Sequence, residues 1–200
     1  MRKKAGRIFF LAMLVTLLAA IPILAKPAPG LAPLAPLSGK WVGRGQGISG
    51  PSVVKQNFSF VLSGFHLANR STARYKPKKG ETVGRFSKTI GIFSFDKIQK
   101  KIIYREFRSD GTFQYFQLIT LTKDKKTFIF QSVNRTNQEQ KILTRLVFHL
   151  IDRDHLQEAI NRATDGKTFE KVESFQLRRV TKKKENRFRK ARKDKPEKLF

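Results

Sequence analysis

The chain has 200 residues, a length that suits one domain with terminal segments. Its 42 Lys and Arg residues outnumber its 15 Asp and Glu residues, so the formal net charge is +27 and the field of the protein attracts polyanions. The sequence has no cysteine, which excludes disulfides, zinc–thiolate sites, iron–sulfur clusters and cysteine nucleophiles.

Residues 1–25 are typical of a secretory signal peptide. Basic residues at positions 2–4 precede an uncharged, mostly apolar run over 8–24, and Ala25 ends the segment. Pro22 favours a cleaved signal over a stable membrane helix, because proline disrupts helix interiors. We therefore expect an exported protein, periplasmic or secreted, with an uncleaved membrane anchor as the alternative.

The body of the chain, residues 34–180, follows a Pro-rich linker over 26–33 and has the pattern of β-strands. Apolar residues alternate with others, as at Phe128 and Phe130, which places successive side chains on opposite faces of a sheet. Asp-Gly pairs at 110–111 and 165–166 favour tight hairpins. The spacing of strands and turns predicts about ten strands in a sandwich or barrel. The segment 145–151 is predicted as a strand, and 31–37 as a short helical turn.

One motif at the start of the body resembles the first strand of a known family. Leu37, Gly39, Trp41, Gly43 and Gly45 form the pattern Leu-x-Gly-x-Trp-x-Gly-x-Gly. This pattern resembles nitrobindin-type barrels, which belong to the calycin group with lipocalins, and further matching segments are 91–96, 105–111, 165–166 and 177–179. The resemblance implies an all-β fold, a single closed antiparallel β-barrel of about ten strands. In this chain the signal helix precedes the barrel, and a basic tail follows it.

The resemblance also implies a structural latch between the two ends of the barrel. In a closed barrel the first and last strands meet, so Trp41 is expected to face Arg178 or Arg179. A guanidinium over an indole contributes about 0.5 to 2 kcal/mol to stability.

Haem binding is not expected to carry over from that family. There, a histidine shortly before the closing strand end holds the iron, and the counterpart here lies near Val172. The chain has three histidines, His66, His149 and His155, and none lies in that stretch, although His149 is the alternative donor from a neighbouring strand. Their spacing does not make a metal site either. We expect no cofactor and no metal.

No nucleophile elbow, phosphate-binding loop or dinucleotide fingerprint is present, so the sequence favours a non-enzymatic protein. The leading prediction is a binding module whose barrel holds a small apolar or amphipathic ligand, although barrels of this size are also filled by their own side chains. The candidate lining is drawn from nine aromatic residues, and only those on the inward face of their strands would line the cavity. They are Phe58, Phe60, Phe93, Phe95, Tyr104, Phe113, Tyr115, Phe128 and Phe130.

The C-terminal segment 181–200 has ten basic and three acidic residues, a balance of 10 − 3 = +7 that is typical of a disordered interaction tail. It suggests an alternative function, a basic surface-adhesion protein that binds anionic envelope polymers, lipid headgroups or nucleic acid. The candidate polyanion-binding residues are Lys182, Lys183, Lys184, Arg187, Arg189, Lys190, Arg192 and Lys193. A haem-binding, nitrobindin-like protein is the third alternative.

Overall fold

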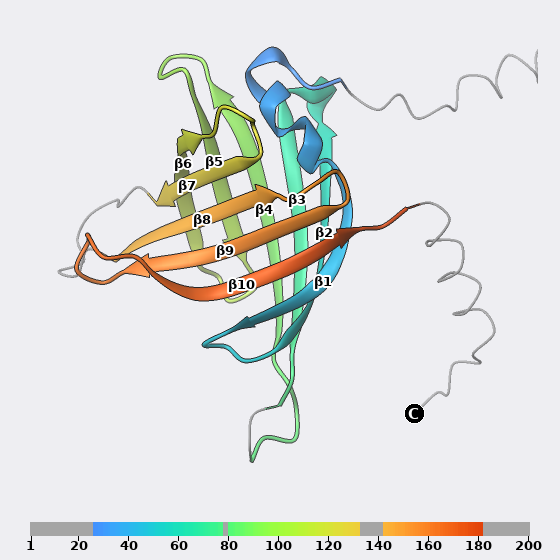
Figure 1. The fold of residues 1–200 in the computed structure, drawn as a ribbon, viewed down its shortest axis with the longest axis vertical. Helices are drawn as coiled ribbons and strands as arrows, with labels where there is room; N and C mark the ends of the chain where they lie inside the picture. The colour runs from blue at the N-terminus through green and yellow to red at the C-terminus, as the bar shows by residue number, and fades with distance from the viewer. Residues whose placement is uncertain (1–25, 78–79, 133–141, 182–200) are drawn as a thin grey trace, which may run out of the picture.

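Ten strands follow one another in sequence order, each antiparallel to its neighbours (Figure 1). The computed structural model describes residues 26–77, 80–132 and 142–181. The strands are β1 (Gly39–Gly47), β2 (Ser52–Val61), β3 (His66–Tyr75), β4 (Phe86–Asp96), β5 (Lys101–Arg108), β6 (Phe113–Leu121), β7 (Thr127–Ser132), β8 (Leu143–Leu150), β9 (His155–Ala163) and β10 (Glu170–Arg179). This count confirms the predicted number of strands.

The sheet closes on itself, because β1 pairs with β10 as well as with β2. The register at this seam sets Trp41 opposite Arg179 and Gly45 opposite Phe175. Closure pairs both edge strands, which removes the exposed edges of an open sheet. The choice between sandwich and barrel is thereby decided in favour of a single closed antiparallel barrel.

The hairpin turns form where the Asp-Gly pairs predicted them. Gly111 and Gly166 have φ of +83° and +72°, a conformation in which a residue with Cβ is strained. Asp110 and Asp165 accept hydrogen bonds from backbone N–H groups two residues further on. The segment 145–151 lies almost wholly in β8, so the prediction of a strand there is confirmed.

A 3₁₀ helix, η1 (Pro29–Leu37), covers one end of the barrel (Figure 1). Leu31, Leu34 and Leu37 are fully buried in the core, so hydrophobic burial holds this segment against the barrel. The helix begins within the segment predicted as linker, so residues 29–33 are helical rather than extended, with Leu31 buried. The predicted signal peptide and the candidate tail residues from Lys182 onward lie outside the described residues. Among the described residues, no helix is long and apolar enough to cross a membrane.

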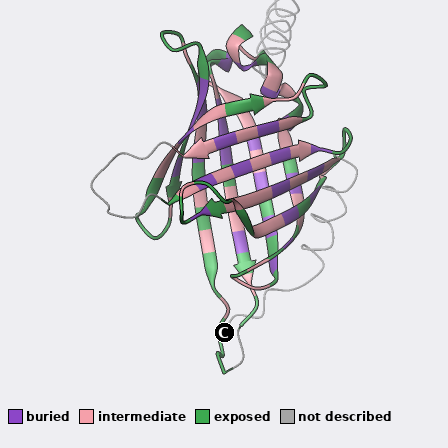
Figure 2. Cartoon of the chain, turned by 60° about the vertical axis from the view of Figure 1, so that its left-hand side comes forward, coloured by how far each residue is buried: buried purple, intermediate pink, exposed green. Residues whose placement is uncertain are grey.

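Buried and more exposed positions alternate along the strands (Figure 2). In β8 the inward residues include Leu146, Phe148 and Leu150, and neighbouring strands add an aromatic cluster to the η1 end of the interior. Its rings include Phe58, Phe93, Phe116, Phe128, Phe130 and Phe148, all 0% or 1% exposed. The barrel is therefore filled by its own side chains at one end.

Candidate functional site

The opposite end of the barrel contains a cavity of about 460 Å³. Its walls come from the start of β2 and β4, the end of β3, β5 and β9, and the first half of β10. These ends lie away from η1, which precedes β1 and packs near the start of β3 and the end of β4. The cavity is therefore the unfilled half of the same interior.

The inward face of each wall strand changes from apolar to polar along its length. On β2 the inward series runs from Phe58 to Gln56, and on β5 Tyr104 is followed by Glu106. On β9 Leu156 is followed by Glu158, which is 8% exposed. Because side chains alternate with period 2, these polar groups lie on the core face of their strands.

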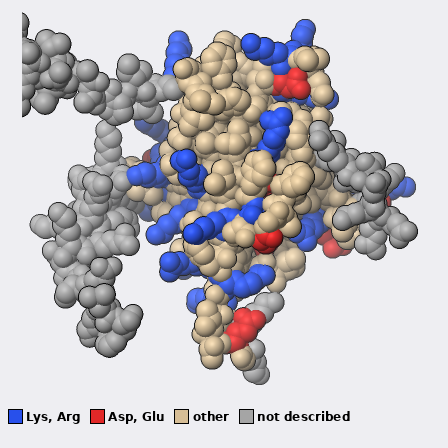
Figure 3. Space-filling model, turned by 180° about the vertical axis from the view of Figure 1, so that it is seen from behind, with Lys and Arg blue, Asp and Glu red and all other residues tan. Residues whose placement is uncertain are grey.

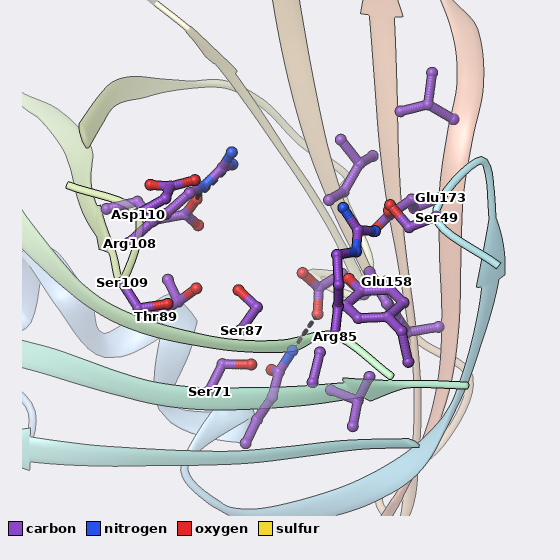
Figure 4. Close-up of a pocket in the computed structure, with 18 of the residues that line it drawn as sticks. Ser49, Ser71, Arg85, Ser87, Thr89, Arg108, Ser109, Asp110, Glu158 and Glu173 are labelled. Carbon is purple, nitrogen blue, oxygen red and sulfur yellow. Dashed lines mark hydrogen bonds and ion pairs between the residues drawn. The ribbon is translucent and has the colours of Figure 1, made fainter. Parts of the chain in front are cut away.

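Glu158 is a buried carboxyl group with no cation paired to it among the described residues. It accepts a hydrogen bond of 2.5 Å from Nε2 of Gln56, drawn as the dashed line in Figure 4. Burial raises the pKa of Glu158 to about 7, and repulsion from Glu106 and Glu173 adds to that rise, while the Gln56 hydrogen bond opposes it.

Glu106, by contrast, has a counter-charge. Its Oε1 lies 2.7 Å from the Arg108 guanidinium, and its Oε2 accepts a hydrogen bond of 3.1 Å from the Tyr104 hydroxyl. Burial raises the pKa of Tyr104 well above its usual range, and the charges of Glu106 and Glu158 raise it further. Tyr104 is thus a neutral donor at the boundary between the aromatic cluster and the cavity.

Two further acceptors beside the cavity have no partner. Oε1 of Gln56 and Oδ1 of Asn69 are buried, and within the described part of the chain neither receives a hydrogen bond. A buried acceptor without a donor carries a desolvation cost of about 1 to 3 kcal/mol. The inner part of the cavity is therefore rich in acceptors and short of donors.

The lining has a charge balance unlike that of the whole protein. It includes three basic residues, Arg85, Arg108 and Arg162, against four acidic residues. The acidic residues are Glu106, Asp110, Glu158 and Glu173, so the formal balance is 3 − 4 = −1 in a chain of net charge +27. Figure 4 shows Arg85 and Glu173 drawn on one side of the cavity and Arg108 and Asp110 on the other.

The nine aromatic residues predicted as ligand-lining lie in different places. Phe58, Phe93, Phe128 and Phe130 belong to the packed cluster, where the Phe93 and Tyr104 rings stack with centroids 4.2 Å apart. Tyr104 is the member that lines the cavity. The others lie at the edge of the cluster or on the surface: Phe60 is half-buried against the core, Tyr115 is half-buried, and Phe95 and Phe113 are exposed.

Sequence reasoning missed the polar residues of the cavity, Gln56, Asn69, Glu106 and Glu158. The sequence contained a signal for Glu158, because Leu156, Glu158 and Ile160 are alternate residues and therefore share one face of the strand. A charged residue at an inward position of a strand is the pattern to look for, but the register that makes it inward comes from strand pairing.

The predicted latch residues occupy the seam between β1 and β10. The Arg179 guanidinium lies over the Trp41 indole, and it also donates hydrogen bonds to the carbonyl oxygens of Pro36 and Ser38. Trp41 itself donates from Nε1 to the Leu37 carbonyl oxygen at 2.8 Å. Arg178 points the other way and is exposed on the outer face.

None of the three histidines faces the cavity. His149 shares a hydrogen bond of 2.8 Å with Thr127 on the outer face of β8, and His66 shares one of the same length with Ser94. His155 pairs with Asp152 in the turn before β9. Val172 lines the cavity, and its side chain offers no donor atom for a haem iron. The described residues also contain no group of three or more His, Asp or Glu arranged to hold a metal ion.

Comparison with known proteins gives a fold and no family. No family model matches the chain, and no curated protein matches it. The chain is similar to a solved structure, that of Rv2717c from M. tuberculosis, with a TM-score of 0.52 and 16% sequence identity. The match covers 78% of this chain and 100% of that one. At this identity the similarity shows the barrel fold alone.

Proposed function

We propose that this protein is an exported, non-enzymatic binding module whose barrel holds a small amphipathic ligand with a cationic head. The observation that carries the proposal is Glu158, a buried carboxyl group beside the cavity with no cation partner in the described part of the chain. A buried charge is stable only when it is paired and hydrogen-bonded, so a ligand ammonium group would complete this site.

The size and lining of the cavity support an amphipathic rather than a wholly apolar ligand. A volume of about 460 Å³ lies within the range of small-molecule sites. Val54, Ala73, Ile160 and Phe175 supply apolar wall, while Gln56 and Asn69 supply acceptors for N–H donors. A ligand with an ammonium head at Glu158 and a short hydrocarbon body would match both the polar acceptors and the apolar wall.

Haem is not part of this proposal, and nitrobindin-type function is not carried over. The three histidines lie on the outer face or at the start of β9, and the counterpart of the family's ligating position lies near Val172. These residues do not fit a haem iron, which needs an axial donor from the protein.

The test is isothermal titration of residues 26–200, which include η1 and all ten strands, with octylammonium, octanoate and octanol below their aggregation concentrations. We expect octylammonium to bind, and octanoate to bind at least about tenfold more weakly, because its carboxylate would face Glu158. Glu158→Gln keeps the shape and removes the charge, so it should weaken octylammonium by about tenfold or more.

Glu170→Gln is the matched control, because Glu170 is exposed on β10 and outside the lining. Equal affinity for octanoate and octylammonium, or an unchanged affinity in Glu158→Gln, would contradict the proposal. Native mass spectrometry of protein taken from its host would then identify the resident ligand by mass.

A further inference from the structure

An exposed apolar row crosses the outer face of three adjacent strands, β4 to β6, and a cation of β3 extends it. Pairing sets Arg70 of β3 opposite Ile90 of β4, Ile90 opposite Phe107 of β5, and Phe107 opposite Phe113 of β6. Ile90 is 51% exposed, Phe107 50% and Phe113 69%. The Phe107 and Phe113 rings stack with centroids 6.5 Å apart. Large apolar side chains gathered in one place on a surface mark an interaction site.

Cations flank this row on both sides. Arg74 and Lys88 both lie over the ring of Phe86, which is 48% exposed, with their charged groups 5.4 Å and 5.5 Å from its centroid. On the other side, Arg105 lies over the Tyr115 ring at 5.6 Å. We call the whole surface the cationic ridge: its apolar members are Phe86, Ile90, Phe107 and Phe113, and its cations are Arg70, Arg74, Lys88 and Arg105.

Acidic side chains are few near this row, and Asp110 lies in the turn between Phe107 and Phe113. The strands β3 to β6 contain two acidic residues, and Glu106 points into the barrel. The other, Asp96, ends β4 and accepts hydrogen bonds from the backbone of Ile98 and Gln99 in the turn. Figure 3 shows the back of the barrel with many basic side chains and few acidic ones.

We propose that the cationic ridge docks the barrel on an anionic lipid bilayer surface. Exposed rings and an aliphatic side chain enter the boundary between headgroups and acyl chains, while flanking guanidinium and ammonium groups meet lipid phosphates. This composition, apolar residues within a basic surface, is what binding to anionic membranes requires.

Two other partners fit less well. A second copy of the same face would bring four cations of the cationic ridge against four more, with few acidic residues such as Asp110 to offset them, so like charges would oppose a dimer. Nucleic acid would use the cations and stack bases on rings, but it gives Ile90 no apolar contact. Phe86 borders both the ridge and the cavity, whereas Arg70, Ile90, Arg105, Phe107 and Phe113 lie outside the cavity lining. Variants at these five positions therefore test this proposal independently of the ligand.

The first test is sedimentation with vesicles of phosphatidylcholine containing about one-third phosphatidylglycerol, using residues 26–200. Ile90→Ser/Phe107→Ser/Phe113→Ser removes the apolar row, and Arg70→Gln/Arg105→Gln removes two cations. We expect the cation variant to lose about fivefold in vesicle binding per cation removed, and the apolar variant at least about tenfold.

The matched controls are Ile98→Ser/Ile151→Ser and Lys125→Gln/Lys167→Gln, which change exposed residues of the same types in turns. They keep wild-type binding if the ridge is the contact. Wild-type vesicle binding by the apolar variant would overturn the proposal. Binding of single-stranded DNA by the same variants is measured beside it. If only the cation variant lost affinity, for both vesicles and DNA, the surface would bind polyanions in general and the proposal would be overturned.

A second measurement detects the docking surface without a variant that loses vesicle binding. Because the chain has no cysteine, Phe113→Cys and Ile98→Cys each give one labelling position for a polarity-sensitive fluorophore. The label at 113 should shift to the blue on anionic vesicles and the label at 98 should not. Equal spectra at the two positions would overturn the ridge as the docking surface.

Discussion

The guanidinium of Arg179, on the last strand, lies over the indole of Trp41, on the first, with its central carbon 4.1 Å from the ring centroid. The same guanidinium donates hydrogen bonds to the carbonyl oxygens of Pro36, Ser38 and Arg153. One side chain therefore joins the barrel seam, the end of η1 and the turn before β9.

Arg179→Ala should lower the free energy of unfolding by about 2 to 4 kcal/mol, because it removes the cation–π contact and leaves several carbonyl oxygens without a donor. Urea unfolding followed by Trp41 fluorescence measures this change. Arg178→Ala is the control, since Arg178 is exposed on the outer face of the same strand and should change stability by less than about 0.5 kcal/mol. Similar losses in the two variants would contradict the role given to Arg179.

The buried Glu158 should make stability fall as pH rises. Its pKa is about 7 in the folded protein, against 4.5 for the unperturbed group, so the folded state keeps a proton that the unfolded state releases. The free energy of unfolding should therefore decrease between about pH 4.5 and pH 7, by up to about 3 kcal/mol from this group, and level off above.

The check is urea unfolding of wild type and Glu158→Gln across that interval. The variant should be the more stable protein at about pH 8 and should match wild type near pH 4.5. Glu170→Gln should follow the wild-type curve throughout, because Glu170 is exposed. If the difference in free energy of unfolding between wild type and Glu158→Gln did not change with pH, Glu158 would be solvated in solution.

The aromatic residues should separate into core and surface classes on truncation. Phe93 is fully buried among four other rings, so Phe93→Ala should cost about 3 to 5 kcal/mol in transfer free energy and cavity formation. Phe113→Ala should cost less than about 1 kcal/mol, since Phe113 is 69% exposed. Thermal unfolding of both variants gives the comparison, and equal costs would contradict the placement of the two rings.

The Tyr104 ring packs directly against Gly91, where a larger residue would leave it no room. A Cβ at position 91 would lie 2.1 Å from the Tyr104 hydroxyl oxygen, closer than any real contact. Gly91→Ala should therefore displace the ring and cost about 1 to 3 kcal/mol. The same variant should weaken octylammonium binding, because Tyr104 lies at the inner end of the cavity. Calorimetric unfolding and titration measure both effects, and wild-type values would show that the ring has room to move.

The alternation of apolar residues and the Asp-Gly turns determined much of the fold in advance. They predicted about ten antiparallel strands, because strand side chains alternate with period 2 and tight turns need residues that tolerate positive φ. The strand over 145–151 followed from the same local rules. These features depend on neighbours in the chain, which a sequence contains in full.

The location of the cavity depended on contacts that no local pattern encodes. Alternation says that Phe93 and Phe113 lie on defined faces of their strands, but pairing decides which face points inward, and it places Phe113 outside. Gln56 and Glu158 are 102 positions apart, and the closed strand order brings them within a hydrogen bond. The sequence by itself determined the strands and turns of this protein, whereas barrel closure alone decided which half of the interior is filled and placed Glu158 in the unfilled half.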